Sequence, residues 1–374
     1  QIPVYDVDKI EKVIDEHKAT LLILSKKRRF PTVEKQIIDL CIEKSVKVLR
    51  TPQVQDWING QLTINQIRNI KIEDLLGRDP IQLDERVVAQ SIYDKIVLVT
   101  GAAGSIGSEI VRQLTMFSPK QIILLDQAES PLYDMEMELL DIFKFKYFET
   151  VIGDITDKVR MEKLFDVLRP QIIFHAAAYK HVPMMENNPY EAIKTNILGT
   201  RTMADLSIKY KIEKFIMVST DKAVRPTNVM GASKRIAEIY TQASNSLNVT
   251  KFITTRFGNV LGSSGSVIPR FKKQIEEGGP VTVTHPEITR YFMTIPEACR
   301  LVLEAQAMGK GGEIFIFDMG KSIKIVDLAK KMIKLAGLQR GVDIEIKYSV
   351  LRPGEKLYEE LLNYQENTLQ THHQ

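Results

Sequence analysis

The chain has 374 residues, a length that corresponds to two domains or to one large domain with a smaller addition. Hydrophobic residues make up 44% and charged residues 26%, which is typical of a globular protein and excludes a collagen-like, coiled-coil or largely disordered chain. The net charge of +4 is too small to predict nucleic-acid binding. Lysine and arginine form only one short run, at 26–29, and this run is best interpreted as a solvated loop.

Only two cysteines occur, Cys41 and Cys299, so neither a disulfide framework nor a cysteine-rich zinc site is expected, and we predict no metal site. No apolar stretch of about 18 residues and no signal segment is present. The sequence starts at Gln1 without methionine and ends in a polar stretch. We therefore expect a piece of a longer protein, in which a membrane anchor could precede Gln1.

Residues 1–80 are predicted to form a small α/β unit and a linker. Helical periodicity alternates there with strand-like runs, at 7–18, 20–25, 33–44 and 46–49. No glycine-rich turn follows these strands, which favours a scaffold or an oligomer contact over a catalytic role. The polar segment 61–85 is expected to connect this unit to the rest of the chain.

From residue 94 onward, short β-branched runs alternate regularly with helix-like stretches. The expected strands are 96–100, 121–126, 149–154, 171–177, 214–219 and 251–257. This alternation predicts βαβ units, a parallel sheet and right-handed crossovers. The predicted fold is α/β, with a doubly wound parallel Rossmann-type sheet at 81–258. A smaller C-terminal region at 259–364 would mainly bind substrate, and 365–374 would form a polar tail.

The first of these strands leads directly into a glycine-rich turn and a helix. The turn has the pattern G-x-x-G-x-x-G, and its candidate cofactor-binding residues are Gly101, Gly104, Ser105, Ile106 and Gly107. Glycine lets the backbone turn tightly and approach a pyrophosphate, and a helix N-terminus offers free N–H groups. The pattern therefore predicts a dinucleotide site.

The ends of the next strands add candidate contacts to the same cofactor. Asp126 lies about 20 residues after the last glycine, where a partner for the ribose 2′-hydroxyl is expected; a carboxylate would repel a 2′-phosphate, which favours NAD over NADP. Asp154 and Ile155 would lie near the adenine, although a turn or a helix cap is an equally good interpretation of Asp154. Ala176 and Ala177 would let the dinucleotide pass close to the backbone, with core packing as the alternative.

The fifth strand ends in a hydroxyl, an acid and an amine, Thr220, Asp221 and Lys222. A desolvated amine beside positive charge has a lowered pKa and can act as a base. The alternative is an N-cap aspartate beside a solvated lysine. Met230 and Lys234 are four residues apart on a predicted helix, so both can point toward the cofactor.

Three long runs, at 175–200, 218–235 and 256–271, resemble the extended short-chain dehydrogenases/reductases, and within them the membrane-associated polysaccharide-biosynthesis dehydratases of the CapD and PglF type. The resemblance covers about residues 95–364. It implies NAD-dependent 4,6-dehydration of UDP-N-acetylglucosamine for bacterial glycans of the bacillosamine type. It also implies transmembrane helices upstream and a site at the cytoplasmic face of the bacterial inner membrane. A homo-oligomer is an option that the motifs leave open.

The resemblance includes two departures from wider patterns. The superfamily's Tyr-x-x-x-Lys pattern has Met230 in the tyrosine position, while Lys234 is retained. A thioether cannot exchange the proton of an alcohol, but the CapD and PglF type shares this methionine, so it indicates a subtype. Lys222 stands where dehydratases of the dTDP-glucose type carry glutamate.

The implied mechanism is an internal redox sequence. Hydride leaves C4 of the sugar, water is eliminated across C5 and C6, and hydride returns to C6. Thr220 would bind the 4-oxygen, Asp221 would protonate the departing 6-hydroxyl, Lys222 would take the C5 proton and Lys234 would hold the nicotinamide ribose. The 4-hydroxyl proton could go to Asp221 directly, through Thr220 or through water. The resemblance favours retention at C5.

The resemblance also implies contacts with the nucleotide sugar, from Lys180, Asn259, Val267, Arg290, Arg352 and Glu355. Asn259 and Arg290 would bind the diphosphate, since the planar guanidinium meets phosphate oxygens two at a time. Arg352 and Glu355 would lie near a phosphate and the ribose, Val267 near the uracil, and Lys180 near the hexose. A surface salt bridge is the alternative for Arg290 and Arg352, and a structural role is the alternative for Lys180.

Two other functions remain open from the sequence. A UDP-sugar 4-epimerase shares the cofactor and the first hydride step, but it needs an acid/base at the 4-oxygen, and Met230 beside Asp221 and Lys222 favours dehydration. A non-catalytic, NAD-binding regulatory module is the second alternative.

Overall fold

The computed structural model describes residues 3–24, 31–44, 46–51, 68–69, 85–362, 368–369 and 371. The chain divides into two compact units, each built from separate stretches. Unit 1 comprises Gln1–Pro80, Val267–Glu287 and Ile323–Ser349, and unit 2 comprises Ile81–Ser266, Ile288–Ser322 and Val350–Gln374. The predicted substrate region 259–364 is thus shared between the units. The basic run 26–29 and most of the segment 61–85 lie outside the described residues.

Unit 1 is built from short helices and strands. Its elements are η1 Val7–Lys9, α1 Ile10–Glu16, β1 Leu21–Leu24, α2 Pro31–Glu43, β2 Lys47–Arg50, β3 Arg68–Asn69, α11 Val267–Glu276, β11 Val281–Val283, β15 Ile323–Lys324, α13 Ile325–Leu335 and β16 Ile346–Tyr348. Strand β1 pairs in parallel with β2, and β3 pairs with β2 in the antiparallel sense. Ile14, Ile38 and Cys41 are buried in the core of this unit, which explains the helical periodicity of the sequence.

Unit 2 contains a parallel sheet whose seven described strands have the order β14-β9-β8-β7-β4-β5-β6. The strands are β4 Ile96–Thr100, β5 Gln121–Asp126, β6 Phe148–Ile152, β7 Ile172–His175, β8 Lys214–Thr220, β9 Lys251–Phe257 and β14 Ile314–Ile316. From β4 the chain runs outward on one side to β5 and β6, and on the other side to β7, β8 and β9. The doubly wound α/β fold is confirmed, and its switch point lies between β4 and β7, where such sheets bind ligands.

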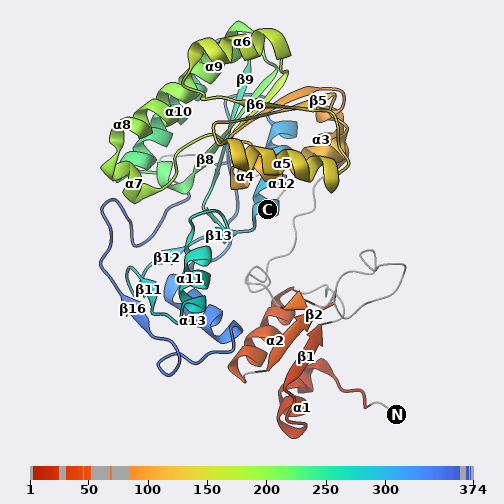
Figure 1. Ribbon diagram of the computed structural model, residues 1–374, viewed down its shortest axis with the longest axis vertical. Helices are drawn as coiled ribbons and strands as arrows, with labels where there is room; N and C mark the ends of the chain where they lie inside the picture. The colour runs from red at the N-terminus through yellow and green to blue at the C-terminus, as the bar shows by residue number, and fades with distance from the viewer. Residues whose placement is uncertain are drawn as a thin grey trace. The chain divides into compact units, whose positions relative to one another are not determined.

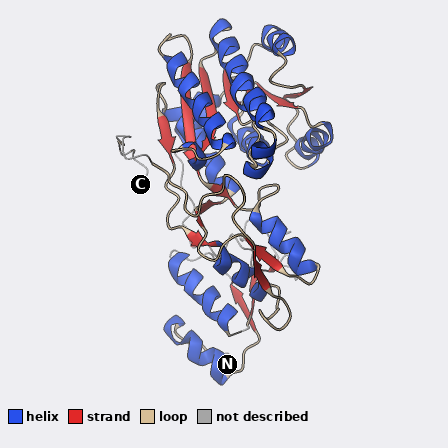
Figure 2. Cartoon of the chain, turned by 90° about the vertical axis from the view of Figure 1, so that its left-hand side faces the viewer, coloured by secondary structure: helices blue, strands red, loops and turns tan. Residues whose placement is uncertain are grey.

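Helices cover both faces of this sheet (Figures 1 and 2). They are α3 Glu85–Ile92, α4 Ser105–Leu114, α5 Glu129–Asp141, α6 Lys158–Leu168, α7 Val182–Asn187, α8 Pro189–Ala192, the π-helix η6 Ile193–Gly199, α9 Thr200–Lys209, α10 Val229–Asn245 and α12 Ile295–Met308. Val97 and Val99 pack on the face toward α4 and α12, whereas Leu98 packs on the face toward α6 and α9. All three side chains are fully buried, which accounts for the continuous apolar runs in the sequence.

Short elements complete unit 2. They are η5 Thr115–Phe117, η7 Asp221–Ala223, β10 Asn259–Val260, β12 Thr289–Arg290 and β13 Phe292–Met293, of which β10 and β13 pair in parallel. Among the helices of the described residues, none is long and apolar enough to cross a membrane.

Candidate active site

The glycine turn between β4 and α4 is packed so tightly that side chains are excluded. Gly101 has φ +68°, in the left-handed region, and a Cβ there would lie 2.7 Å from the backbone nitrogen of Ala177. A Cβ on Gly107 would lie 2.0 Å from the carbonyl oxygen of Gly101. Gly104 is the N-cap of α4 and provides no side-chain cap, so the first N–H groups of the helix face the turn. These features fit a bound pyrophosphate.

A pocket of about 150 Å³ lies beside this turn. Its lining includes the predicted cofactor residues Gly101, Gly104, Asp126, Asp154, Ile155, Ala176 and Ala177. Ser105 and Ile106 begin α4 behind it; the Ser105 hydroxyl accepts a hydrogen bond of 3.1 Å from the backbone of Ser264, and Ile106 packs against the core. The pocket therefore gathers residues from the ends of β4, β5, β6 and β7.

The two aspartates at the pocket are both held by backbone N–H groups. Asp126 accepts from Ala103 and from Ala128, each at 3.0 Å, which fixes its carboxylate between the glycine turn and the start of α5. Asp154 accepts from Thr156 at 2.8 Å, so it closes a turn as well as lining the pocket. Negative charge at Asp126 suits a ribose diol and disfavours a 2′-phosphate.

A buried polar network that the sequence analysis did not identify holds the segment after β7. Asn196, in the π-helix, accepts from the backbone N–H of Tyr179 at 2.8 Å and donates to the hydroxyl of Ser233 at 2.9 Å. His175 lies between Thr100 and Thr200, at 2.9 and 3.0 Å, and burial together with the charge of Lys234 lowers its pKa to about 3. His175 is therefore a neutral structural residue.

Thr220, Asp221 and Lys222 come together at the carboxyl end of β8. The Asp221 Oδ1 atom accepts from the Thr220 hydroxyl at 2.8 Å and from the Lys222 ammonium at 2.9 Å. Lys222 Nζ also donates to Asn259 Oδ1 at 3.1 Å. The residue Asp221 is 1% exposed, and its Oδ2 atom is buried and has no hydrogen-bond partner among the described residues. An unsatisfied buried carboxylate oxygen of this kind is typical of a group with a catalytic or binding role.

A buried ion pair supports the end of β8 from within the sheet. Glu238 on α10 accepts from Arg256 Nε at 2.8 Å and from Arg256 Nη2 at 2.7 Å, and both residues are at most 1% exposed. The Ser219 hydroxyl also donates to Glu238, at 2.6 Å. Because Ser219 directly precedes Thr220, this pair fixes the backbone that carries the acid and the amine.

Met230 and Lys234 are buried on the first turns of α10, as their spacing predicts. Lys234 Nζ donates to the Val218 carbonyl at 2.7 Å, and burial, opposed by the Glu238 carboxylate, lowers its pKa to about 8. Met230 packs against Val182 and Met185. A Cβ on Gly231 would lie 2.2 Å from the Lys222 carbonyl, so α10 begins directly against the segment that carries Asp221 and Lys222.

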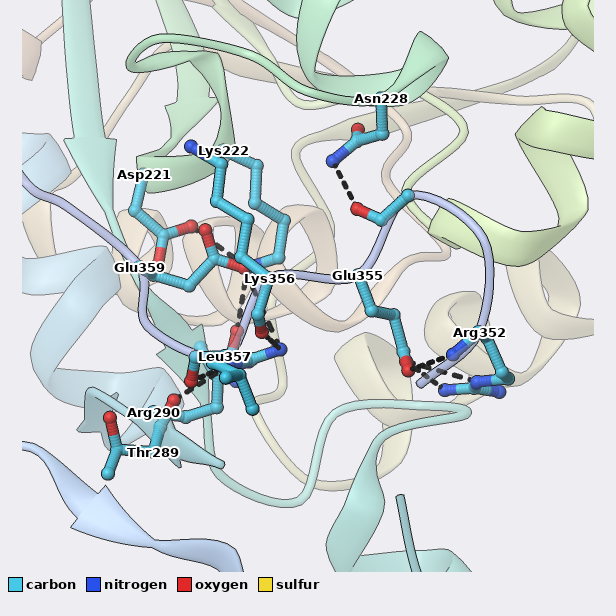
Figure 3. A network of polar contacts seen from close by, with 12 residues as sticks. Asp221, Lys222, Asn228, Thr289, Arg290, Arg352, Glu355, Lys356, Leu357 and Glu359 are labelled. Carbon is cyan, nitrogen blue, oxygen red and sulfur yellow. Dashed lines mark hydrogen bonds and ion pairs between the residues drawn. The ribbon is translucent and has the colours of Figure 1, made fainter. Parts of the chain in front are cut away.

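The C-terminal segment 350–362, which we call the strap, crosses this site (Figure 3). Asn228 Nδ2 donates to the Gly354 carbonyl at 3.0 Å, and Lys356 Nζ donates to the Arg225 carbonyl at 2.9 Å. Arg290 donates to the carbonyls of Lys356 and Leu357, at 2.8 and 3.1 Å. Arg290 is thus placed beneath the strap, where it holds backbone groups.

The strap also carries Arg352, Glu355 and Glu359. Arg352 and Glu355 bind each other, with Nε and Oε1 3.0 Å apart. Glu359, which the sequence analysis did not single out, lies beside Lys222, with its Oε1 atom 3.8 Å from Nζ. Of the remaining predicted substrate residues, Lys180 is exposed after β7, and Val267 is the first residue of α11 in unit 1.

No group of three or more His, Cys, Asp or Glu side chains in the described residues is arranged to hold a metal ion. The polar groups around Lys222 are instead the hydroxyl of Thr220, the amide of Asn259 and the carboxylates of Asp221 and Glu359. Such groups bind a sugar and exchange protons with it.

Residues 97–374 match the family described as "Polysaccharide biosynthesis protein". The chain is similar to the capsular polysaccharide biosynthesis protein CapD of Staphylococcus aureus, with 50% identity over 366 residues, covering 96% of this chain and 60% of that protein. It therefore spans about 60% of the length of this relative. The resemblance to the CapD type is confirmed.

Relatives with two named activities have lower identity. A UDP-N-acetylglucosamine 4,6-dehydratase (inverting) of Campylobacter jejuni is 35% identical, covering 74% of this chain and 79% of that protein. A UDP-glucose 4-epimerase of Rickettsia canadensis is 36% identical, covering 72% and 78%. The X-ray structure of Pen from Bacillus thuringiensis has a TM-score of 0.69 and 36% identity, covering 73% of this chain and 84% of that one.

Proposed function

The chain belongs to the polysaccharide biosynthesis protein family, and from this premise we propose that it is an NAD-dependent 4,6-dehydratase of UDP-N-acetylglucosamine. The observation that carries the proposal is the buried contact between Asp221 and Lys222 at the end of β8, beside a helix with methionine in the tyrosine position. An acid and an amine placed side by side suit the loss of water next to a ketone.

The glycine turn, the N-terminus of α4 and Asp126 would hold NAD. When bound, this cofactor supplies a hydride acceptor that becomes a hydride donor, so that a sugar can be oxidised and reduced in one cycle. Lys234, on α10, would hold the nicotinamide ribose. The tight packing at Gly101 and Gly107 and the two N–H bonds that fix Asp126 support this assignment.

The chain's own residues would handle the protons. Thr220 donates to Asp221, which supports a path by which the proton of the 4-hydroxyl passes through Thr220 to the acid. Asp221 would then give this proton to the departing 6-hydroxyl. Lys222 would take the proton from C5 and return it to the same carbon. The product would be a UDP-4-keto-6-deoxy-N-acetylhexose, a precursor for bacterial glycans of the bacillosamine type.

For the nucleotide, Arg352 and Glu355 on the strap would bind a phosphate and the ribose, with Asn259 and Arg290 near the diphosphate. Lys180 would reach the hexose and Val267 the uracil. We also propose that the protein acts at the cytoplasmic face of the bacterial inner membrane and that it forms homo-oligomers. Cell fractionation and light scattering test these two points.

The second candidate is a UDP-sugar 4-epimerase, which the Rickettsia canadensis relative favours. Incubation with NAD and UDP-N-acetylglucosamine, followed by mass spectrometry, separates the outcomes. We expect loss of one water. An isomer of unchanged mass would indicate the epimerase, and an unaltered substrate would indicate a non-catalytic NAD-binding module.

Variants test the residue roles. Asp221→Asn and Lys222→Met are expected to lower turnover at least ~100-fold, the usual contribution of general acid–base groups, while NAD stays bound. Lys158→Met, at an exposed position on α6, is the matched control. Turnover near the wild-type rate in either site variant would remove that residue from the mechanism.

A further inference from the structure

Glu359 is a buried acid of the strap that the proposed mechanism does not use. Its side chain is 3% exposed, and its Oε1 atom lies 3.8 Å from Lys222 Nζ and 3.8 Å from Arg290 Nη2. Its Oε2 atom is buried and has no hydrogen-bond partner among the described residues. Figure 3 shows its carboxyl group close to Asp221 and Lys222. A buried carboxyl group with one unsatisfied oxygen lowers the stability of the fold. Groups of this kind are therefore candidates for a functional role.

The arrangement around Lys222 makes a proton acceptor necessary. An amine accepts a proton from carbon only when it is neutral, so an ammonium at Lys222 must first lose one. Asp221 already accepts from Lys222 and from Thr220, and in the proposed function it holds the proton for the departing hydroxyl. Asn259 offers an amide oxygen, which is not basic. Bulk water has little access, because the side chain of Lys222 is 15% exposed.

Glu359 meets the requirement for this acceptor. Burial raises its pKa above the ordinary value, the charge of Lys222 lowers it, the charge of Asp221 raises it, and the charges of Arg290 and Lys356 lower it. The net shift is upward, so the protonated form of Glu359 is favoured relative to an ordinary glutamate. These four residues are the charged groups that face it from η7, β12 and the strap.

We propose that Glu359 is a positioning residue that accepts a proton from the Lys222 ammonium and thereby sets the amine to act as the base at C5. The step breaks one N–H bond of Lys222 and forms one O–H bond on Glu359, with no redox change and no other reactant. A neutral pair replaces an ion pair inside a dry site. Contacts of this kind shorten in the substrate complex. The inference rests on the proposed 4,6-dehydration.

The test compares Glu359→Gln with Glu360→Gln, a matched control on the next residue, which pairs with Arg225 and has a side chain that is 36% exposed. Turnover of UDP-N-acetylglucosamine is measured from pH 6 to 10. We expect Glu359→Gln to lose about 10–100-fold in kcat at pH 7, with KM changed less than about 3-fold, and to recover as the pH rises, because hydroxide can then take the proton from the amine in place of Glu359. Glu360→Gln should keep the wild-type profile.

A second readout follows the absorbance of NADH after rapid mixing with substrate. Oxidation at C4 does not need the Lys222 base, so NADH should form in Glu359→Gln and accumulate above the wild-type level. A rate and pH profile equal to those of Glu360→Gln would overturn the role of Glu359, and so would loss of NADH formation together with dehydration.

If Glu359→Gln does not fold, Glu359→Asp decides. It keeps the carboxyl group, and it should show the wild-type pH dependence with a rate reduced about 10-fold or less. A loss well above 10-fold at pH 7, or a rate that recovers only as the pH rises, would overturn the proposal, because the carboxyl group that aspartate retains would then not serve as the acceptor. Failure of the wild-type protein to release water from the substrate would instead refute the proposed function, so the two failures are distinguishable.

Discussion

Replacement of Glu238 by glutamine tests how unit 2 holds the strand that carries Asp221 and Lys222. The substitution keeps the shape of the side chain but removes its charge. Arg256 then remains 1% exposed beside a neutral amide, and the Ser219 hydroxyl loses its carboxylate acceptor. Removal of one partner of a buried ion pair costs about 3–5 kcal/mol, because the remaining charge stays desolvated.

This free energy converts into a large thermal shift. At about 2–4 °C per kcal/mol for a domain of 150–250 residues, the melting temperature of unit 2 should fall by roughly 6–20 °C. The matched control is Glu213→Gln, whose side chain is 48% exposed and pairs with Lys95. An exposed pair contributes about 0–1 kcal/mol, so the control should shift the melting temperature by less than about 4 °C.

The stabilisation by Glu238 should also depend on pH in a predictable direction. Burial raises the pKa of Glu238, but the hydrogen bonds and charge of Arg256, with those from Ser219 and Arg235, outweigh burial and hold the pKa below the ordinary value of 4.5. The stabilisation is therefore fully present above pH 4.5 and is lost as the pH falls below it. Circular dichroism melts at pH 7 and at lower pH should show the gap between wild type and Glu238→Gln narrowing in acid. Equal melting temperatures at pH 7, or a gap that widens in acid, would refute the reasoning.

Three further predictions concern the cofactor pocket and its surroundings. Gly107→Ala should abolish NAD binding in fluorescence titrations, because the new Cβ would lie 2.0 Å from the Gly101 carbonyl; binding within 3-fold of wild type would contradict the packing. Asp126→Asn should move the ratio of the Kd values for NAD and NADP about tenfold toward NADP, or ~1.4 kcal/mol, and an unchanged ratio would remove Asp126 as the discriminator. The pKa of Lys234 is about 8 in the native state and 10.5 in the unfolded state. Urea unfolding should therefore show that the free energy of unfolding of wild type rises relative to that of Lys234→Met between pH 8 and 10.5. A constant difference across that range would refute the lowered pKa.

The sequence predicted the sheet of unit 2 well, because each strand and each turn is encoded locally. Strands β4, β5 and β9 have the predicted bounds. Strand β7 ends at His175, two residues earlier than predicted, since Ala176 and Ala177 leave the ladder to line the pocket. Strand β14 was missed because it has only three residues, within a segment that lacks clear alternation.

The candidate catalytic residues Thr220, Asp221 and Lys222 are contiguous in the sequence, whereas the groups around them come from distant parts of the chain. Asn196 lies in a π-helix that no periodicity indicates. Glu359 is one of two adjacent acids, and only the fold distinguishes it from the more exposed Glu360. The ion pair of Glu238 with Arg256 was likewise missed, because its two residues lie on different elements, α10 and β9, and nothing in the sequence pairs them.

The strap has a consequence for biosynthesis. Synthesis on the ribosome proceeds from the N-terminus, so the nascent chain exposes the glycine turn and all the pocket-lining residues up to Thr195 well before residues 350–362 emerge. The residues that line the pocket and the strap that carries Glu359 are therefore synthesised at different moments. A polypeptide truncated before residue 350 retains the pocket lining but lacks the final carboxylate beside Lys222.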